Sequence, residues 1–256
     1  MVPPGSAWQN FYGDMSLALG AIRRGLTITV LTALAVAGSA ALFVFGHGQG
    51  AAAATLVLFG AWVVFGGVQR WWLSELLAGR RVATGEFPPI FRSMLWRFLI
   101  LALWVATPAV IAVVTYVVVY FVQHPHVLNE RSPKVPNPST AFVITLSVGT
   151  AVIVDILLTF VMPALALSTR SVRNAMQLGI RMIAQTWPTS AWYVLAPGVT
   201  LLAALCYVPI PDIACTILLA AAGVLSLWIK GATVGFYQRS FRGSTTATTK
   251  DLPPSP

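Results

Sequence analysis

The sequence has few charged residues, and acidic residues are the rarest of these. Of its 256 residues, 9% are charged and only seven are Asp or Glu, whereas an average soluble domain has roughly 25% charged residues. No GxSxG, HExxH or GxxxxGK[ST] motif is present, and no pair of carboxylates shares one predicted helix face. These absences favour a non-enzymatic chain that needs no cofactor.

Long apolar runs take the place of charge. Hydrophobic residues make up 57% of the chain, and the mean hydropathy is +0.79. A helix needs roughly 20 apolar residues to cross a bilayer core of about 30 Å. We therefore predict an all-α polytopic membrane protein with six transmembrane helices, at residues 26–45, 51–72, 95–122, 141–167, 189–208 and 213–237.

The positions of Lys and Arg predict the orientation, because positive charge is retained on the cytoplasmic side. Only Arg131 and Lys134 fall on the side opposite to the other basic residues. Both chain ends are therefore expected in the cytoplasm, with residues 1–242 as a single integral membrane domain and residues 243–256 as a disordered polar tail. The net charge of +9 then reflects contact with anionic lipid head groups, and nucleic acid is not expected as a partner.

The six predicted helices group into three hairpins, each preceded by a short basic amphipathic stretch at residues 16–26, 91–99 or 173–187. We predict a short cytoplasmic amphipathic helix at each of these stretches. The third stretch predicts a cytoplasmic helix that lies along the membrane surface; the alternative is a plain charged connector. Its apolar residues recur at helical spacing on one side: Val172, Met176, Gly179, Ile180 and Ile183.

The passage FVMPALALSTRSVRNAMQLGIRMIAQTWPT, residues 160–189, places a proline-alanine turn in an apolar helix and a basic amphipathic helix after it. With the three-hairpin layout, it resembles bacterial six-helix membrane-protein families of unknown function, including the membrane domain found with some glycerophosphodiester phosphodiesterases. The resemblance implies a membrane module. It does not imply phosphodiesterase activity, because this sequence contains no such catalytic domain.

Asp155 is the one acidic residue within the predicted transmembrane runs. A carboxylate at the bilayer centre costs roughly 2.5–3.5 kcal/mol on insertion scales, so it is expected to face protein or water and to have a partner. Thr159 follows one turn later on the same face, and Lys230 lies in the last predicted helix. Asp155 is then a neutral acid bonded to Thr159 or the backbone, an ion-pair partner of Lys230, or a site for a substrate, an ion or a proton.

Small residues and prolines leave two further questions open. Pro108, Pro163 and Pro197 interrupt predicted helices and either form static packing kinks or line a pathway. Gly231 and Gly235 allow two helix backbones to approach closely, either within the chain or between two copies.

The predicted external side contains all three histidines, His47, His124 and His126, which could offer imidazole ligands to Zn²⁺. The loop after His124 is too rich in proline for a predictable ligand geometry, so no metal is expected. Cys206 and Cys215 flank the turn between the last two predicted helices, either as a disulfide or as two separate thiols.

These patterns predict a membrane module or partner subunit, associated with the lipid bilayer and with envelope or lipid processes. The partner could be another membrane protein or a second copy of the chain. Frequent Arg and Ala with only three Lys are typical of a GC-rich bacterium, so the expected location is the bacterial inner membrane. The alternatives are a small transporter or channel that uses Asp155, and a membrane-embedded lipid enzyme.

Overall fold

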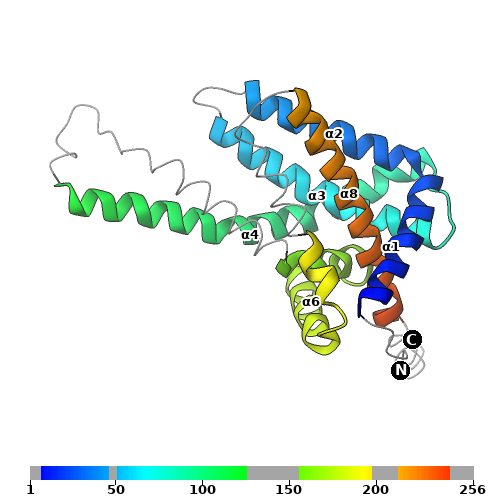
Figure 1. Cartoon of the computed structure of the whole chain (residues 1–256). Helices are drawn as coiled ribbons and strands as arrows, with labels where there is room; N and C mark the ends of the chain where they lie inside the picture. The colour runs from blue at the N-terminus through cyan, green and yellow to red at the C-terminus, as the bar shows by residue number, and fades with distance from the viewer. Residues whose placement is uncertain (1–6, 46–50, 126–155, 198–212, 243–256) are drawn as a thin grey trace, which may run out of the picture.

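The computed structural model of the chain consists of helices packed against one another (Figure 1). It describes residues 7–45, 51–125, 156–197 and 213–242. Within these ranges the regular elements are helical and no strand occurs. The all-α class expected from the apolar runs is thus confirmed.

Most helix bounds follow the predicted runs. In chain order the elements are α1 (Ala7–Arg24), α2 (Leu26–Phe45), α3 (Ala51–Leu77), η1 (Thr84–Glu86), α4 (Phe87–Gln123), α6 (Val172–Thr186), α8 (Ile213–Tyr237) and η3 (Gln238–Arg242). Ile156–Leu167 and residues 191–197 are also helical. α2 and α8 have the bounds of the first and last predicted transmembrane helices, whereas α3 ends later and α4 begins earlier than predicted.

The end of α3 is a helix stop that the sequence encodes. Gly79 has a φ of +80°, and its amide donates to the carbonyl of Leu76 at 3.0 Å, while the amide of Arg80 donates to Glu75 at 2.9 Å. This pairing is a Schellman motif, which satisfies the last carbonyls of the helix. Two prolines then lie in the first turn of α4, where a proline costs no intrahelical hydrogen bond.

Two of the three amphipathic stretches belong to helices separate from the following apolar run, and the second does not. α1 contains residues 16–24 and turns by 93° into α2, and α6 contains most of the third stretch. Residues 91–99 are instead part of α4, a single helix of 37 residues. The prediction of a separate second amphipathic helix was wrong, because no glycine or proline interrupts the backbone hydrogen bonds between residues 90 and 107.

The apolar side predicted for α6 is partly buried in the protein and partly exposed. The helix buries Val172, Ala175, Gly179 and Met182, whereas Ile180 is 53% exposed. A Cβ atom on Gly179 would lie 2.8 Å from the backbone nitrogen of Val161. α6 therefore packs through its small residues against the backbone of the Ile156–Leu167 helix, and this close contact turns Ile180 outward.

The core lies where α3, the start of α4, the Ile156–Leu167 helix, α6 and α8 meet. Its large and fully buried side chains include Phe98, Phe160, Leu165, Met182 and Tyr193. The close approach predicted for Gly231 occurs within the chain, because a Cβ atom there would lie 2.9 Å from the Cβ atom of Ala18 in α1. α4 remains helical through Pro108, and Ile156–Leu167 remains helical through Pro163.

Within the described ranges, one stretch is long and apolar enough by itself to cross a bilayer. This is Phe87–Thr107 of α4, with a mean hydropathy of 1.5. The bent pair Ala7–Arg24 and Leu26–Ala35 meets the same criteria when taken as one unit. Large parts of the predicted helices at 141–167 and 189–208 lie outside the described residues, so six transmembrane helices remain a prediction.

Candidate functional site

Asp14 is the centre of a buried polar cluster that joins α1 to Tyr193 and to η3. This residue of α1 is 3% exposed, and the hydroxyl of Tyr193 donates to its Oδ2 at 2.5 Å. The guanidinium of Arg239 in η3 contacts both carboxylate oxygens, Oδ1 through Nη1 and Oδ2 through Nη2. Two fork-like contacts of this kind are the strongest geometry that an arginine forms with a carboxylate.

Burial and charge act in opposite directions on Arg239. Partial burial by itself would lower its pKa, but the hydrogen bond and the charge of Asp14 outweigh this effect and raise the pKa above its ordinary value. The Arg239 side chain is still 52% exposed. The guanidinium therefore neutralises Asp14 and keeps one side open to solvent.

Aromatic packing fixes the position of Tyr193. Its ring stacks on Phe236 of α8 with 4.4 Å between the centroids, and the edge of Phe11 contacts it at 5.0 Å. Asp14 follows Phe11 by three residues and precedes Ala18 by four, so all three lie on the buried face of α1. The amphipathic pattern of α1 thus directs the carboxylate towards the tyrosine hydroxyl.

A pocket of about 850 Å³ opens beside this cluster. It lies between α1, the end of α6, residues 187–189 and the junction of α8 with η3. Asp14 and Arg239 form part of its lining, together with amides, hydroxyls and aromatic rings. The pocket therefore combines a neutralised ion pair with many groups that can form hydrogen bonds.

A second polar chain crosses α2, α3 and α8 among apolar residues. Lys230 donates from Nζ to Oε1 of Gln69 at 3.0 Å, and Nε2 of Gln69 donates to the Thr32 hydroxyl at 2.8 Å. The Thr32 hydroxyl in turn donates to the carbonyl of Ile28 at 2.7 Å. Gln69 and Thr32 are both 1% exposed. Because each forms hydrogen bonds with its neighbours, these buried polar groups connect the Lys230 ammonium group to the backbone of α2.

The predicted site of Asp155, Thr159 and Lys230 is described only in part. Asp155 lies outside the described residues. Thr159 is 2% exposed in the Ile156–Leu167 helix, and Lys230 contacts Gln69 as described above. The pairing of Asp155 with Thr159 or Lys230 stays a prediction. So does its alternative role as a site for a substrate, an ion or a proton, on which the transporter alternative depends.

The metal and disulfide hypotheses also fall largely outside the described ranges, which exclude His47, His126 and Cys206. His124 is described: its Nδ1 lies 3.1 Å from the carbonyl of Tyr120, and its ring stacks on that residue at 4.6 Å. Among the described residues, no group of three or more His, Cys, Asp or Glu could hold a metal ion. The disulfide between Cys206 and Cys215 stays a prediction.

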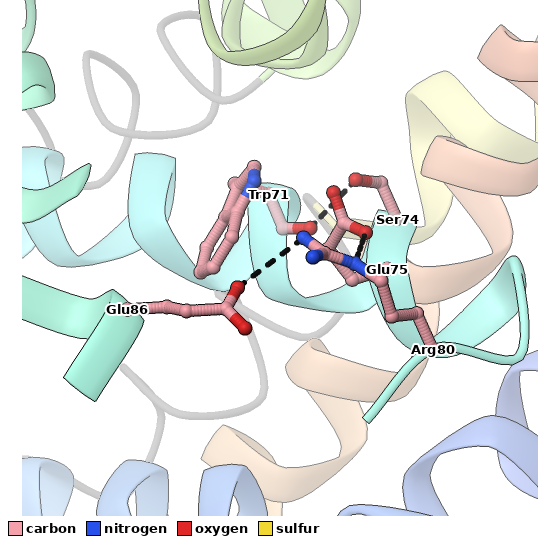
Figure 2. Close-up of polar contacts among 5 residues, drawn as sticks. All are labelled: Trp71, Ser74, Glu75, Arg80 and Glu86. Atoms are coloured by element: carbon pink, nitrogen blue, oxygen red, sulfur yellow. Dashed lines mark hydrogen bonds and ion pairs between the residues drawn. The ribbon is translucent and has the colours of Figure 1, made fainter. Parts of the chain in front are cut away.

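Arg80 links α3 to the start of α4 on the surface. Figure 2 shows its guanidinium between two carboxylates, with Nε 2.6 Å from Oε2 of Glu75 and Nη2 3.3 Å from Oε2 of Glu86. The hydrogen bond to Glu75, the charge of that residue and the charge of Glu86 raise the pKa of Arg80. Exposed pairs of this kind stabilise a fold little, so this cluster positions the loop and is not a candidate site.

Comparisons with protein-family models, with curated proteins and with solved structures find no match for this chain. The resemblance to six-helix membrane families therefore stays a prediction from residues 160–189 and the helix layout. The polar pocket beside Asp14 and the buried chain from Thr32 to Lys230 are the candidate sites within the described residues.

Proposed function

We propose that the chain is a non-enzymatic integral membrane module that acts as a partner subunit in an envelope or lipid-associated process. The observation that carries this proposal is the exposed surface of α4. Large apolar side chains are exposed along its length, among them Trp96 at 72%, Leu103 at 67% and Val122 at 74%. An apolar patch of this extent is rare on a soluble monomer and marks a membrane or protein contact.

The dimensions of α4 support contact with lipid. At 1.5 Å per residue its 37 residues span about 55 Å, which exceeds a bilayer core of about 30 Å. Figure 1 shows the carboxyl-terminal part of α4 extending beyond the other labelled helices. Lipid chains would cover this surface at no cost, whereas water would have to hydrate it.

The chemistry of the described sites supports a role without catalysis. Asp14 is the acidic residue in the lining of the pocket, and Arg239 already neutralises it. General acid–base catalysis needs a group that can exchange a proton with a substrate near working pH. The Asp14 cluster instead has the composition of a binding or structural site.

Two substitutions on α4 test the membrane role. Leu103→Asp introduces a charge into the predicted span, which costs roughly 2.5–3.5 kcal/mol at the bilayer centre. Gln123→Asp is the matched control, because Gln123 is exposed at the polar end of the same helix. We expect the parent chain and Gln123→Asp to stay in the membrane pellet after alkaline carbonate extraction, and Leu103→Asp to be depleted from it.

A soluble protein would give a different pattern. Leu103 is exposed, so an aspartate there would be tolerated or would improve solubility if water surrounded α4. Release of the parent chain by carbonate would contradict the proposal, and equal retention of the two variants would contradict contact of Leu103 with lipid.

A further inference from the structure

The pocket beside Asp14 has the size of a small-molecule site. Its volume of about 850 Å³ lies within the range of about 300–1,000 Å³ that is usual for ligand pockets. Its lining comes from both ends of the chain and from the end of α6. The pocket therefore forms only when these distant segments have packed together.

The polar lining favours a neutral ligand with hydroxyl groups. The charged residues of the lining are Asp14 and Arg239, and these form an ion pair with each other. The other polar lining groups are amides and hydroxyls, which both donate and accept hydrogen bonds, including Asn10, Ser16, Gln185, Thr186 and Ser240. A phosphate or an ammonium group would find no unneutralised counter-charge here, whereas a sugar or polyol would find donors and acceptors.

Aromatic rings in the same lining add a second feature of sugar binding. Tyr12 and Trp187 line the pocket and are 67% and 55% exposed. The face of an aromatic ring carries partial negative charge, so it attracts the weakly positive C–H groups on the apolar face of a sugar ring. The lining can thus contact both the hydroxyl edge and the C–H face of one sugar.

Neighbouring aromatic residues indicate where the pocket lies relative to a bilayer. Trp8 of α1 and Trp192 meet edge to face at 5.0 Å, and they are 51% and 44% exposed. Leu17, which also lines the pocket, is 61% exposed. Exposed Trp and Tyr beside apolar side chains are typical of the head-group level of a membrane.

We propose that this pocket binds the neutral, hydroxyl-bearing head group of a glycolipid. The inference rests on the proposed membrane role, because that role brings a lipid head group to the pocket. Hydrogen bonds from the amides and hydroxyls select the sugar, the rings of Tyr12 and Trp187 cover one of its faces, and Leu17 contacts the start of the acyl chains. The same sugar chemistry could come from a free saccharide, and the experiment separates the two sources.

Native mass spectrometry of the full chain, purified in mild detergent, provides the test. The probes are monoglucosyl dioleoylglycerol, dioleoylphosphatidylglycerol, dioleoylglycerol without a head group, and free methyl glucoside. We expect the glucosyl lipid to be retained in preference to both other lipids, and free methyl glucoside to bind more weakly because it lacks the acyl chains. Retention of phosphatidylglycerol or dioleoylglycerol at the level of the glucosyl lipid would overturn the proposal.

A double substitution in the lining tests the location. Asn10→Ala with Gln185→Ala removes two hydrogen-bonding amides and should weaken retention of the glucosyl lipid roughly tenfold. Gln177→Ala is the matched control, because Gln177 is exposed on α6 and does not line the pocket. Equal retention by both variants would place the sugar elsewhere. If the double variant loses its cooperative melting transition, Ser240→Ala replaces it. This smaller change in the same lining should also weaken retention of the glucosyl lipid.

Failure of this inference and failure of the membrane proposal give different results. A chain that stays in the membrane after carbonate extraction but shows no preference for the glucosyl lipid defeats the head-group pocket alone. A chain that carbonate releases, and that binds methyl glucoside as tightly as the glucosyl lipid, defeats the membrane role and identifies a free saccharide as the ligand.

Discussion

Tyr193 donates a hydrogen bond to a carboxylate that lies 179 residues earlier in the chain. Both residues are buried, so the hydroxyl would need another partner if this bond were lost, whereas the carboxylate would keep Arg239. A hydrogen bond to a charged group contributes about 1.5–3 kcal/mol to stability, more than a bond between neutral groups. This contact should therefore be measurable in a single substitution.

Tyr193→Phe removes the hydroxyl and keeps the ring between Phe11 and Phe236. We expect it to lower the free energy of unfolding by about 1–3 kcal/mol. Tyr12→Phe makes the same chemical change at a residue that is 67% exposed, and it should stay within about 0.5 kcal/mol of the parent chain. Thermal melting of the two variants in the same detergent gives the comparison, and equal melting temperatures would show that the bond to Asp14 adds no stability.

The sequence identifies some of the polar residues of the candidate sites but not others. Asp155 and Lys230 were identified because a charge within an apolar run is conspicuous. Asp14 was missed, although its spacing from Phe11 and Ala18 places it on the apolar face of α1 and could have revealed it. Gln69 could not be recognised as the acceptor for Lys230, because that contact depends on how α3 and α8 are rotated relative to each other.

At the scale of elements, the close contact between α6 and the Ile156–Leu167 helix depends on one glycine. A Cβ atom at Gly179 would lie 2.8 Å from the backbone nitrogen and 3.0 Å from the Cα atom of Val161. Backbone atoms cannot move aside as a flexible side chain can, so the two helices would have to separate. Gly20 in α1 provides a contrast, because a Cβ atom there would meet no atom within 4 Å.

Gly179→Ala should lower the free energy of unfolding by about 1–3 kcal/mol, the usual cost of adding volume to a packed core. Gly20→Ala should instead raise it by up to about 1 kcal/mol, because alanine favours the helix more than glycine does. Denaturation of both variants in detergent, followed by circular dichroism, measures the difference. A shift in the same direction for both would mean that helix propensity, and not the contact with Val161, determines the effect.

Element-level prediction succeeded where local signals were strong. The apolar runs predicted the bounds of α2 and α8. They did not predict the end of α3 at Leu77 or the start of α4 at Phe87, where glycine and proline mark the break. The spacing in α6 predicted one apolar side but not which of its residues contact the protein. Small residues allow the close packing, so Ala175 and Gly179 face the core while the larger Ile180 faces outward.

At the scale of the whole molecule, the contacts of α1 join it to the last described elements of the chain, α8 and η3. Figure 1 shows α1 beside the carboxyl-terminal part of α8. Arg239 in η3 pairs with Asp14 in α1, and the indole of Trp228 in α8 donates to the carbonyl of Met15. If the chain crosses a membrane, these contacts keep residues 14 and 239 on the same side of it. That this side is the cytoplasm stays a prediction from the distribution of Lys and Arg.

Cysteine labelling in intact cells tests that arrangement. In a background with Cys206→Ala and Cys215→Ala, the variants Gly48→Cys, Ser132→Cys and Ile210→Cys should react with an impermeant maleimide, because these positions follow odd-numbered predicted helices. Ala83→Cys and Thr246→Cys should react only after the membrane is permeabilised. Ala83 is exposed in the turn between α3 and α4, so burial within the protein would not explain its protection. Labelling of Ala83→Cys in intact cells would place the arginines around residues 80–97 outside, and the charge distribution would then have predicted the wrong orientation.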